Sequence, residues 1–288
     1  MTKTGTLFHT PRVSVPWLQQ HQAHPQLVIL DGSWYLPNSG RNGQQEFTLK
    51  HLPNAQYFDF NRTFAAKSAL PQMLPSTEEF SHAAQVLGIN QNSQIVVYDG
   101  QGLFSAARVW WMFKVMGHHA VAILDGGLPA WEANGGRVTA QPSPRRPLGD
   151  FKAQLQPQWY ANQADMAAAI RQPHSRIVDA RSPNRFAGHE CEPRAGVQSG
   201  HMPGATNLHY QTLLTAGKLK TKAQLNSLFT QADLQPQQRL LFSCGSGVTA
   251  CILAFAANEL NYLNWAVYDG SWSEWGADPN TPKSRLAE

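Results

Sequence analysis

The stretch LLFSCGSGVTACILAFA, residues 240–256, places a cysteine between two apolar runs and follows it at once with Gly-Ser-Gly. We expect a buried strand at 240–243 and a buried helix at 248–260, because continuous apolar runs of these lengths fit elements covered on both faces. CGSG is then the turn that joins them. In open α/β sheets, ligands bind beyond the carboxyl ends of strands, where helix N-termini present free N–H groups. The turn around Cys244 is therefore the first candidate site.

The two glycines of this turn predict a backbone that curls around an anion. Gly245 and Gly247 can take backbone angles closed to other residues, so that consecutive N–H groups form an anion-binding nest. A thiol at the rim of such a nest is expected to ionise easily and act as a nucleophile. A lone cysteine is more often a small buried hydrophobe, but a core cysteine needs no glycines after it. We predict that Cys244 is a nucleophile and that Cys251, in the apolar helix, packs in the core.

Four landmarks recur in order along the chain, which indicates a duplicated domain rather than a short solenoid repeat. LVILDGSW parallels SRIVDARSP, HLPNAQYF parallels HMPGATNL, IVVYDGQG parallels LLFSCGSG, and LDGGLPAWEANG parallels YDGSWSEWGADP. The offsets are 148, 150, 145 and 144 residues, by subtraction of Asp31 from Asp179, His51 from His201, Gly102 from Gly247 and Asp125 from Asp269. Asp99 stands where the second copy has Cys244, so one copy carries the nucleophile and the other does not.

Strand-like and helical runs alternate within each copy. The strand candidates are residues 27–30, 95–98, 121–124, 176–178, 240–242 and 265–268, and the helix candidates are 77–87, 103–116, 222–231 and 248–260. This alternation predicts an α/β fold of two tandem domains, each a mainly parallel sheet flanked by helices. Residues 136–157 are rich in Pro, Gly and Arg, and we interpret them as a linker between domains at 1–135 and 158–288.

Composition narrows the functional class. Hydrophobic residues make up 42% of the 288 residues, charged residues 15%, and the net charge of +4 is scattered, which argues against a nucleic-acid surface. Three cysteines, Cys191, Cys244 and Cys251, do not make a disulfide framework, and none lies at zinc-ligand spacing. The sequence shows no signal peptide or membrane span. We expect a cytoplasmic protein with no nucleic-acid or membrane partner and no metal or organic cofactor.

The motifs HMPGA, CGSGVTA and DG.W..W resemble those of the tandem-domain rhodanese family. The likeness covers nearly the whole chain, and the CGSGVTA loop is most similar to that of the 3-mercaptopyruvate sulfurtransferases. Thiosulfate sulfurtransferases of the family carry basic residues where Gly245 and Ser246 stand. A tyrosine-phosphatase loop needs an arginine at the position of Ala250, which argues against a phosphatase. The resemblance implies that the second domain carries the chemistry and that the first helps to wall the cleft.

The resemblance also implies roles for single residues. Arg185 and Arg194 match the family's substrate-binding arginines, and a guanidinium suits the carboxylate of mercaptopyruvate because it donates two parallel hydrogen bonds. Arg181, beside Asp179 at a strand end, is expected to be structural. The loop residues implied at the site are Cys244 and Ser246 as catalytic residues and Gly245, Gly247, Val248 and Thr249 as substrate-binding residues.

The expected reaction is ping-pong sulfur transfer. The Cys244 thiolate takes sulfur from mercaptopyruvate, releases pyruvate and holds the sulfur as a persulfide. A thiol acceptor, such as thioredoxin or a small thiol, or cyanide in an assay, then removes it. Cys191 lies between Arg185 and Arg194 and reads as an ordinary loop cysteine; its oxidative pairing with Cys244 is a further hypothesis.

The chain departs from the family where a histidine and an acid are expected to support the loop serine. Gln72, in QMLP, takes the histidine position and Asn61 takes the acid position, so neither can transfer a proton near neutral pH. Gln72 can still hydrogen-bond Ser246. Two alternatives stay open: a sulfurtransferase that prefers thiosulfate or another sulfane donor, and a non-catalytic rhodanese-type binding module.

Overall fold

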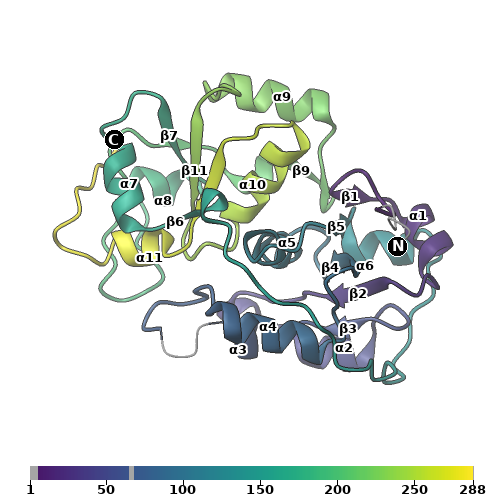
Figure 1. Ribbon diagram of the computed structural model, residues 1–288. Helices are drawn as coiled ribbons and strands as arrows, with labels where there is room; N and C mark the ends of the chain where they lie inside the picture. The colour runs from purple at the N-terminus through teal and green to yellow at the C-terminus, as the bar shows by residue number, and fades with distance from the viewer. Residues whose placement is uncertain (1–5, 65–67, 288) are drawn as a thin grey trace. The chain divides into compact units, whose positions relative to one another are not determined.

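The computed structural model describes residues 6–64 and 68–287, apart from the side chain of Asn61. By contacts the chain divides into two compact units, drawn in Figure 1. Of the described residues, unit 1 holds 6–64, Pro75–Leu155 and Ala216–Leu219, and unit 2 holds 68–74, Gln156–Thr215 and 220–287. The domain limits expected from the sequence stay a prediction. The contact units differ from them in placing 136–155, most of the predicted linker, in unit 1. They also give 68–74 to unit 2 and Ala216–Leu219 to unit 1.

Unit 1 is an α/β unit. Its strands are β1 Arg12–Val13, β2 Leu27–Asp31, β3 Gln56–Tyr57, β4 Gln94–Tyr98, β5 Val121–Leu124 and β10 Lys218–Leu219. Its helices are α1 Val15–His21, α2 Gly43–Leu49, α3 Phe60–Thr63, α4 Thr77–Val86, α5 Ala106–Val115 and α6 Gly127–Ala133, with a 3₁₀ turn at Pro37–Ser39.

Unit 2 repeats this plan. Its strands are β6 Tyr160–Ala161, β7 Ser175–Asp179, β8 Thr206–Asn207, β9 Leu214–Thr215, β11 Arg239–Ser243 and β12 Trp265–Tyr268. Its helices are α7 Gln163–Ala169, α8 Pro183–Ala187, α9 Lys222–Gln231, α10 Ala250–Glu259 and α11 Ser271–Trp275, with 3₁₀ turns at Pro157–Trp159 and Tyr210–Leu213.

The two main sheets have the same topology. Their strand orders are β1-β5-β4-β2-β3 and β6-β12-β11-β7-β8, and all the pairings are parallel. In unit 2, β11 lies at the centre, between β12 and β7, so the loop that follows it opens at the carboxyl edge of the sheet. The predicted fold class and each of the six predicted strands are confirmed.

Each sheet is buried on both faces, as the continuous apolar strand runs predict. In unit 2, Met166 of α7 and Trp272 and Trp275 of α11 pack with Leu241 and Tyr268 on one face. Intervening residues such as Phe242 point to the other face, where α10 packs on β11 and β12. Among the described residues no helix is long and apolar enough to cross a membrane.

The repeated histidines of HLPNA and HMPGA have one structural role in both units. The ring of His51 stacks on Phe47 at 4.1 Å and lies 2.7 Å from the Phe47 carbonyl oxygen through Nδ1. The ring of His201 stacks on Phe186 at 4.0 Å, with Nδ1 2.8 Å from that residue's carbonyl oxygen. This landmark therefore marks the duplicated fold and not the chemistry.

Two helices begin later than predicted, because the residues at their expected starts belong to the preceding loop. The helices expected at 103–116 and 248–260 begin later, at Ala106 and Ala250, because the preceding residues wrap around the loops after β4 and β11. The helix expected at 77–87 begins at Thr77, after a capping box in which Ser76 and Glu79 bond each other's backbone N–H groups.

Candidate active site

The start of α11 holds the Cys244 loop in place. Cys244 directly follows β11 and is 2% exposed. Its N–H donates to Ser271 Oγ at 3.1 Å, and its carbonyl accepts from Trp272 N–H at 2.9 Å. The carbonyl of Gly245 accepts from both the N–H (2.9 Å) and the hydroxyl (2.5 Å) of Ser273. These contacts hold the backbone of Cys244 and Gly245 and thereby position the Cys244 side chain.

Ser271 makes its hydrogen bond from a conformation that usually belongs to glycine. Its φ is 50°, and at the matching position unit 1 has Gly127 with φ 54°. A non-glycine residue in the left-handed region costs roughly 1–2 kcal/mol. The Ser271 hydroxyl accepts from Cys244 N–H and donates to the Tyr268 carbonyl at 2.9 Å, so the strain is offset by two bonds that glycine cannot make. The sequence analysis did not single out Ser271, although the first copy has Gly126-Gly127 where the second has Gly270-Ser271.

The two loop glycines have different reasons for being glycine. Gly247 has φ 77°, as the nest prediction requires. Gly245 is not in the left-handed region, so the expectation of special backbone angles is wrong there. Its reason is space, because a Cβ on Gly245 would lie 3.1 Å from Arg185 Nη2. The arginine therefore lies directly against the loop.

The equivalent loop of unit 1 demonstrates the anion-binding geometry. The Asp99 carboxylate accepts four backbone hydrogen bonds of 2.7–2.9 Å. The donors are the N–H groups of Gln101, Gly102, Phe104 and Ala106. A loop of this shape thus gathers its N–H groups around a negative charge, and in unit 1 the charge is supplied by the chain itself.

With the offset of 145, Ser246 and Gly247 match the first two donors, Gln101 and Gly102. Beyond Gly247 the loop of unit 2 is one residue shorter, because α10 begins six residues after Cys244 whereas α5 begins seven residues after Asp99. Cys251 N–H donates to the Val248 carbonyl at 3.2 Å, within the start of α10. In unit 1, a Cβ on Gly100 would overlap the Tyr35 hydroxyl. The Tyr35 hydroxyl therefore occupies the space next to Gly100, whereas the group next to Gly245 is the guanidinium of Arg185.

Helix α8 presents Arg185 to the loop. The helix begins with Ser182 as N-cap and Pro183 in its first turn, and it ends at Gly188 in the left-handed conformation. Arg185 donates through Nε (3.2 Å) and Nη2 (2.5 Å) to the two carboxylate oxygens of Glu192. Its side chain is 22% exposed, so it can still meet a ligand.

Arg194 reaches the same loop from the other binding motif. Its Nη1 donates to Ser273 Oγ at 2.9 Å, and Ser273 in turn bonds the Gly245 carbonyl. Burial lowers the pKa of Arg194 and the charge of Arg185 lowers it further, while the charges of Cys244 and Glu192 raise it. These four groups therefore act on one another electrostatically.

Gln72 also contacts Arg194. Its Oε1 accepts from Arg194 Nη2 at 3.5 Å, and its φ of 54° is unusual for a residue with a side chain. The segment is held by a 2.8 Å bond from Leu74 N–H to Asp269 Oδ2. The expected bond from Gln72 to Ser246 stays a prediction. Asn61 falls in α3, and its side chain lies outside the described part of the chain.

Arg181 is fixed within the fold. Its side chain is 1% exposed, and it donates to Asp179, to Glu192 and to the carbonyl of Gly200. Glu192, which bridges Arg181 and Arg185, is 4% exposed and was not singled out from the sequence. GHECEPR holds two acids, Glu190 and Glu192, and this irregular segment carries no periodic signal that would mark one of them as buried.

The remaining predicted positions are near the loop or in the core. Ser246 and Val248 are buried, and Thr249 is the N-cap residue of α10. Cys251 is fully buried with Sγ 3.2 Å from the Gly247 carbonyl oxygen, and Cys191 is exposed. Within residues 6–64 and 68–287, no group of three or more His, Cys, Asp and Glu side chains could hold a metal ion.

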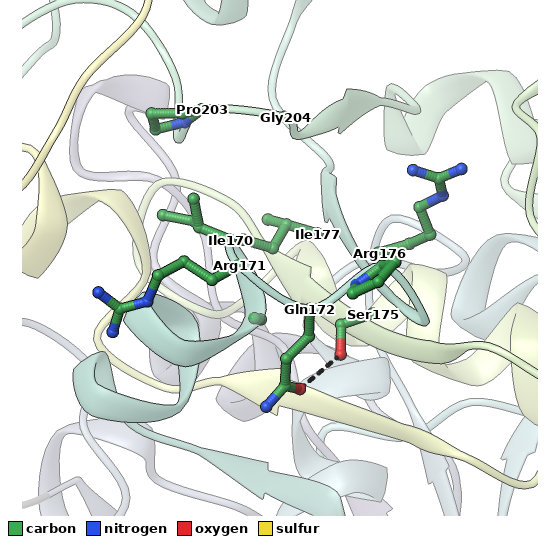
Figure 2. Close-up of a pocket in the computed structure, with 10 residues that line it drawn as sticks. Ile170, Arg171, Gln172, Ser175, Arg176, Ile177, Pro203 and Gly204 are labelled. Atoms are coloured by element: carbon green, nitrogen blue, oxygen red, sulfur yellow. Dashed lines mark hydrogen bonds between the residues drawn. The ribbon is translucent and has the colours of Figure 1, made fainter.

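A hollow of about 300 Å³ lies elsewhere on unit 2 and is shown in Figure 2. Arg171, Gln172, Ser175 and Arg176 line it, and Gln172 and Ser175 share a 3.1 Å hydrogen bond. Ser175 begins β7, so this hollow is at the amino ends of the parallel strands. Cys244 follows the carboxyl end of β11, so the hollow is not part of the candidate site.

Comparison with known proteins agrees with this geometry. The model of the rhodanese-like domain matches residues 14–134 and 162–278. The chain belongs to the rhodanese family. The resemblance read from its motifs is thereby confirmed, together with the tandem arrangement of two rhodanese-like domains.

Several named sulfurtransferases are similar over most of the chain. A protein of Arabidopsis thaliana named thiosulfate/3-mercaptopyruvate sulfurtransferase 1, mitochondrial, is 39% identical over 94% of this chain and 77% of its own. The 3-mercaptopyruvate sulfurtransferase of Rattus norvegicus is 39% identical over 91% of each chain. The crystal structure of SseA from Escherichia coli, described as a 3-mercaptopyruvate sulfotransferase, has a TM-score of 0.84 at 35% identity, covering 91% of this chain and 99% of its own.

Proposed function

We propose that this chain is a sulfurtransferase that moves sulfur from 3-mercaptopyruvate to a thiol acceptor through a persulfide on Cys244. The observation that carries the proposal is the convergence of two arginines on one loop. Arg185 lies against Gly245, and Arg194 reaches the Gly245 carbonyl through Ser273. A nucleophile flanked by a nest and two guanidinium groups suits a donor that is both a carboxylate and a sulfur carrier.

In the first half-reaction, the Cys244 thiolate attacks the donor sulfur. The new S–S bond forms as the carbon–sulfur bond breaks, and that electron pair leaves on carbon as the enolate of pyruvate. The enolate then takes one proton to give pyruvate. The loop N–H groups and Arg185 and Arg194 stabilise the negative charges of the thiolate and the leaving group. The Asp99 loop supports this assignment, because the loop at the equivalent place in unit 1 surrounds an anion with four backbone N–H groups.

In the second half-reaction, an acceptor thiolate or cyanide attacks the outer sulfur of the persulfide. The S–S bond breaks, its electron pair returns to Cys244, and the thiolate is regenerated. A small thiol or thioredoxin is the proposed physiological acceptor. The cytoplasmic location also stays a prediction, since one similar protein carries "mitochondrial" in its name.

Gln72 bears on the proton needed by the enolate. An amide cannot supply that proton near neutral pH. Gln72 Oε1 instead accepts from Arg194 Nη2 at 3.5 Å. The proton therefore comes from the donor's own thiol or from water. The pH profile of turnover should accordingly lack an inflection from a histidine at this position.

Thiosulfate is the second candidate donor. Two cationic side chains at the loop are compatible with a dianion, and the printed name of the Arabidopsis relative includes both donors. A non-catalytic binding module fits less well, because the loop keeps Cys244 together with both glycines. Steady-state kcat/KM for each donor, with cyanide and with a thiol as acceptors, separates these readings.

The deciding experiment is mass spectrometry after incubation with each donor. We expect the wild-type chain to gain one sulfur atom on Cys244, and we expect Cys244→Ser to gain none and to transfer none. Cys251→Ser is the matched control, because Cys251 packs in α10 and should leave the mass shift unchanged. Substantial turnover by Cys244→Ser would contradict the assigned nucleophile.

Arg185→Ala and Arg194→Ala test the carboxylate contact. Loss of one charge-assisted hydrogen bond typically costs about 1.5–3 kcal/mol, which is roughly one to two decades in kcat/KM. The loss should be largest for mercaptopyruvate and different for thiosulfate, which has no carboxylate. Equal losses for both donors would argue against specific carboxylate recognition.

A further inference from the structure

Glu192 is a buried carboxylate that lies behind the substrate-facing arginine. It is in the loop between α8 and β8, with its side chain 4% exposed. Oε1 accepts from Arg181 Nη1 at 2.8 Å and from Arg185 Nε at 3.2 Å, and Oε2 accepts from Arg185 Nη2 at 2.5 Å. A carboxylate is stable in such a place only when charged donors compensate for its lost hydration.

One of its two partners is rigidly held. Arg181 donates to both oxygens of Asp179, at 2.6–3.1 Å, and to the Gly200 carbonyl at 2.7 Å. Glu192 therefore joins a fixed arginine to Arg185, whose Nη2 lies against Gly245. The position of the Arg185 guanidinium over the loop depends on this link.

Unit 1 contains the same arrangement built from different sequence. Arg41 donates through Nε (2.7 Å) and Nη2 (2.6 Å) to the two oxygens of Glu46, and its Nη2 would lie 3.4 Å from a Cβ on Gly100. The two residues are five apart, against seven for Arg185 and Glu192. An arginine over the loop is thus paired side-on with a glutamate in both units, although the spacing is not preserved.

The glutamate also sets the charge of the site. Asp179 and Arg181 compensate each other. Arg185 and Arg194 contribute two positive charges and Glu192 one negative charge, which leaves one net positive charge before Cys244 ionises. The charges of Arg185, Glu192 and Cys244 are also those that shift the pKa of Arg194. With the thiolate present, the wild-type site is close to neutral.

We infer that Glu192 is a specificity-determining residue: by fixing Arg185 and removing one positive charge, it favours a singly charged donor over a doubly charged one. This inference rests on the proposed function. Mercaptopyruvate carries one negative charge and thiosulfate two, so the wild-type complex with thiosulfate holds one more uncompensated negative charge. In a partly buried site that excess is costly.

The test is the ratio of kcat/KM for thiosulfate to kcat/KM for mercaptopyruvate. Glu192→Gln keeps the shape and removes the charge, and we expect it to raise this ratio about tenfold or more, equivalent to about 1.4 kcal/mol. Glu192→Asp keeps the charge but is one methylene shorter. It should lower kcat/KM for both donors and leave their ratio unchanged, with most of the effect in KM.

A second charge variant guards against misfolding of the first. Ser246→Lys adds one positive charge at the loop and leaves Arg185 and Glu192 themselves unchanged, and it should move the ratio in the same direction as Glu192→Gln. An unchanged ratio in the folded charge variants would overturn the inference, and so would an equal shift in Glu192→Asp. If the wild-type chain used neither donor, the proposed function would fail first, which separates the two failures.

Discussion

Asp31 is a buried carboxylate without the arginine that pairs with Asp179, its counterpart in unit 2. Asp179, at the matching strand end of unit 2, is paired with Arg181, whereas 148 residues earlier the arginine position is Ser33. Asp31 is 2% exposed and accepts a hydrogen bond from Ser33 N–H at 2.9 Å. Burial raises its pKa from 3.8 to about 6, against the lowering effect of bonds with Ser33 and Tyr98. We predict that Asp31→Asn stabilises unit 1 above pH 6.

The magnitude follows from linkage. The folded chain holds the Asp31 proton to a higher pH than the unfolded chain, so this stabilisation is complete below about pH 4 and is lost as the pH rises through 6. A difference of about 2.2 pH units at 1.36 kcal/mol each gives about 3 kcal/mol at pH 7 or above. Asparagine does not ionise, so the variant avoids this loss. The stability difference between variant and wild type should therefore grow between pH 4 and pH 7.

Hydrogen exchange is the suitable assay, because a chain with two units need not unfold in one step. Peptides covering β2 and β4 report on unit 1, and at pH 7 their exchange should slow by about a hundredfold in Asp31→Asn. Asp179→Asn is the control of opposite sign, since it removes an anionic partner of buried Arg181, and breaking such a pair costs about 3–5 kcal/mol. A stability difference that does not change between pH 4 and pH 7 would refute the argument.

Three further predictions concern the loop. Gly245→Ala should raise KM with little effect on stability, because its Cβ would press on Arg185 Nη2. Gly247→Ala, at φ 77°, should instead lower stability by roughly 1–2 kcal/mol. Thermal unfolding and kinetics compare the two variants, and equal KM values for Gly245→Ala and wild type would count against the contact with Arg185. Ser271→Gly should lower turnover while keeping the unfolding temperature close to that of wild type, and Ser271→Ala should lower both, since it keeps the strain and loses the hydroxyl; a fully active Ser271→Gly contradicts the positioning role. Gln72→His with Asn61→Asp should raise mercaptopyruvate turnover and introduce a pH dependence near the histidine reference value of about 6.5; an unchanged pH–rate profile means either that proton transfer is not limiting or that residue 72 does not meet Ser246.

The central strands could be predicted because their apolar runs are continuous and each repeats in the other copy. The edge strands β1, β3, β6 and β8 were not predicted, since each has two residues and no pattern can be read over that length. The helices α8 and α11, of five residues each, also lacked a period. These two helices carry Arg185, Ser271 and Ser273, so part of the site is built by elements that the sequence did not reveal.

The candidate site itself was only half visible. Cys244 stood out because glycines follow it, and Arg185 and Arg194 because their motif matches a family. Ser273 acts through a contact between segments far apart in sequence, since it lies 79 residues from Arg194. Glu192 bonds to Arg185 and Arg181, seven and eleven residues away, in an irregular segment without a period. No local pattern encodes such a bond, because each partner alone reads as an ordinary polar surface residue. The role of Gly245 was misjudged for the same reason, since its neighbour Arg185 comes from another element.

The duplicated loop explains why one unit can be chemically silent while keeping the fold. In unit 1 the Asp99 carboxylate satisfies four N–H groups, and Tyr35 lies against Gly100. Replacing Asp99 alone with cysteine would leave Tyr35 over the loop, and it would leave Arg41 engaged by Glu46. In unit 2 the second arginine is brought in by Ser273, which also holds Gly245. What distinguishes the two units is therefore the set of side chains above the nest as much as the residue within it.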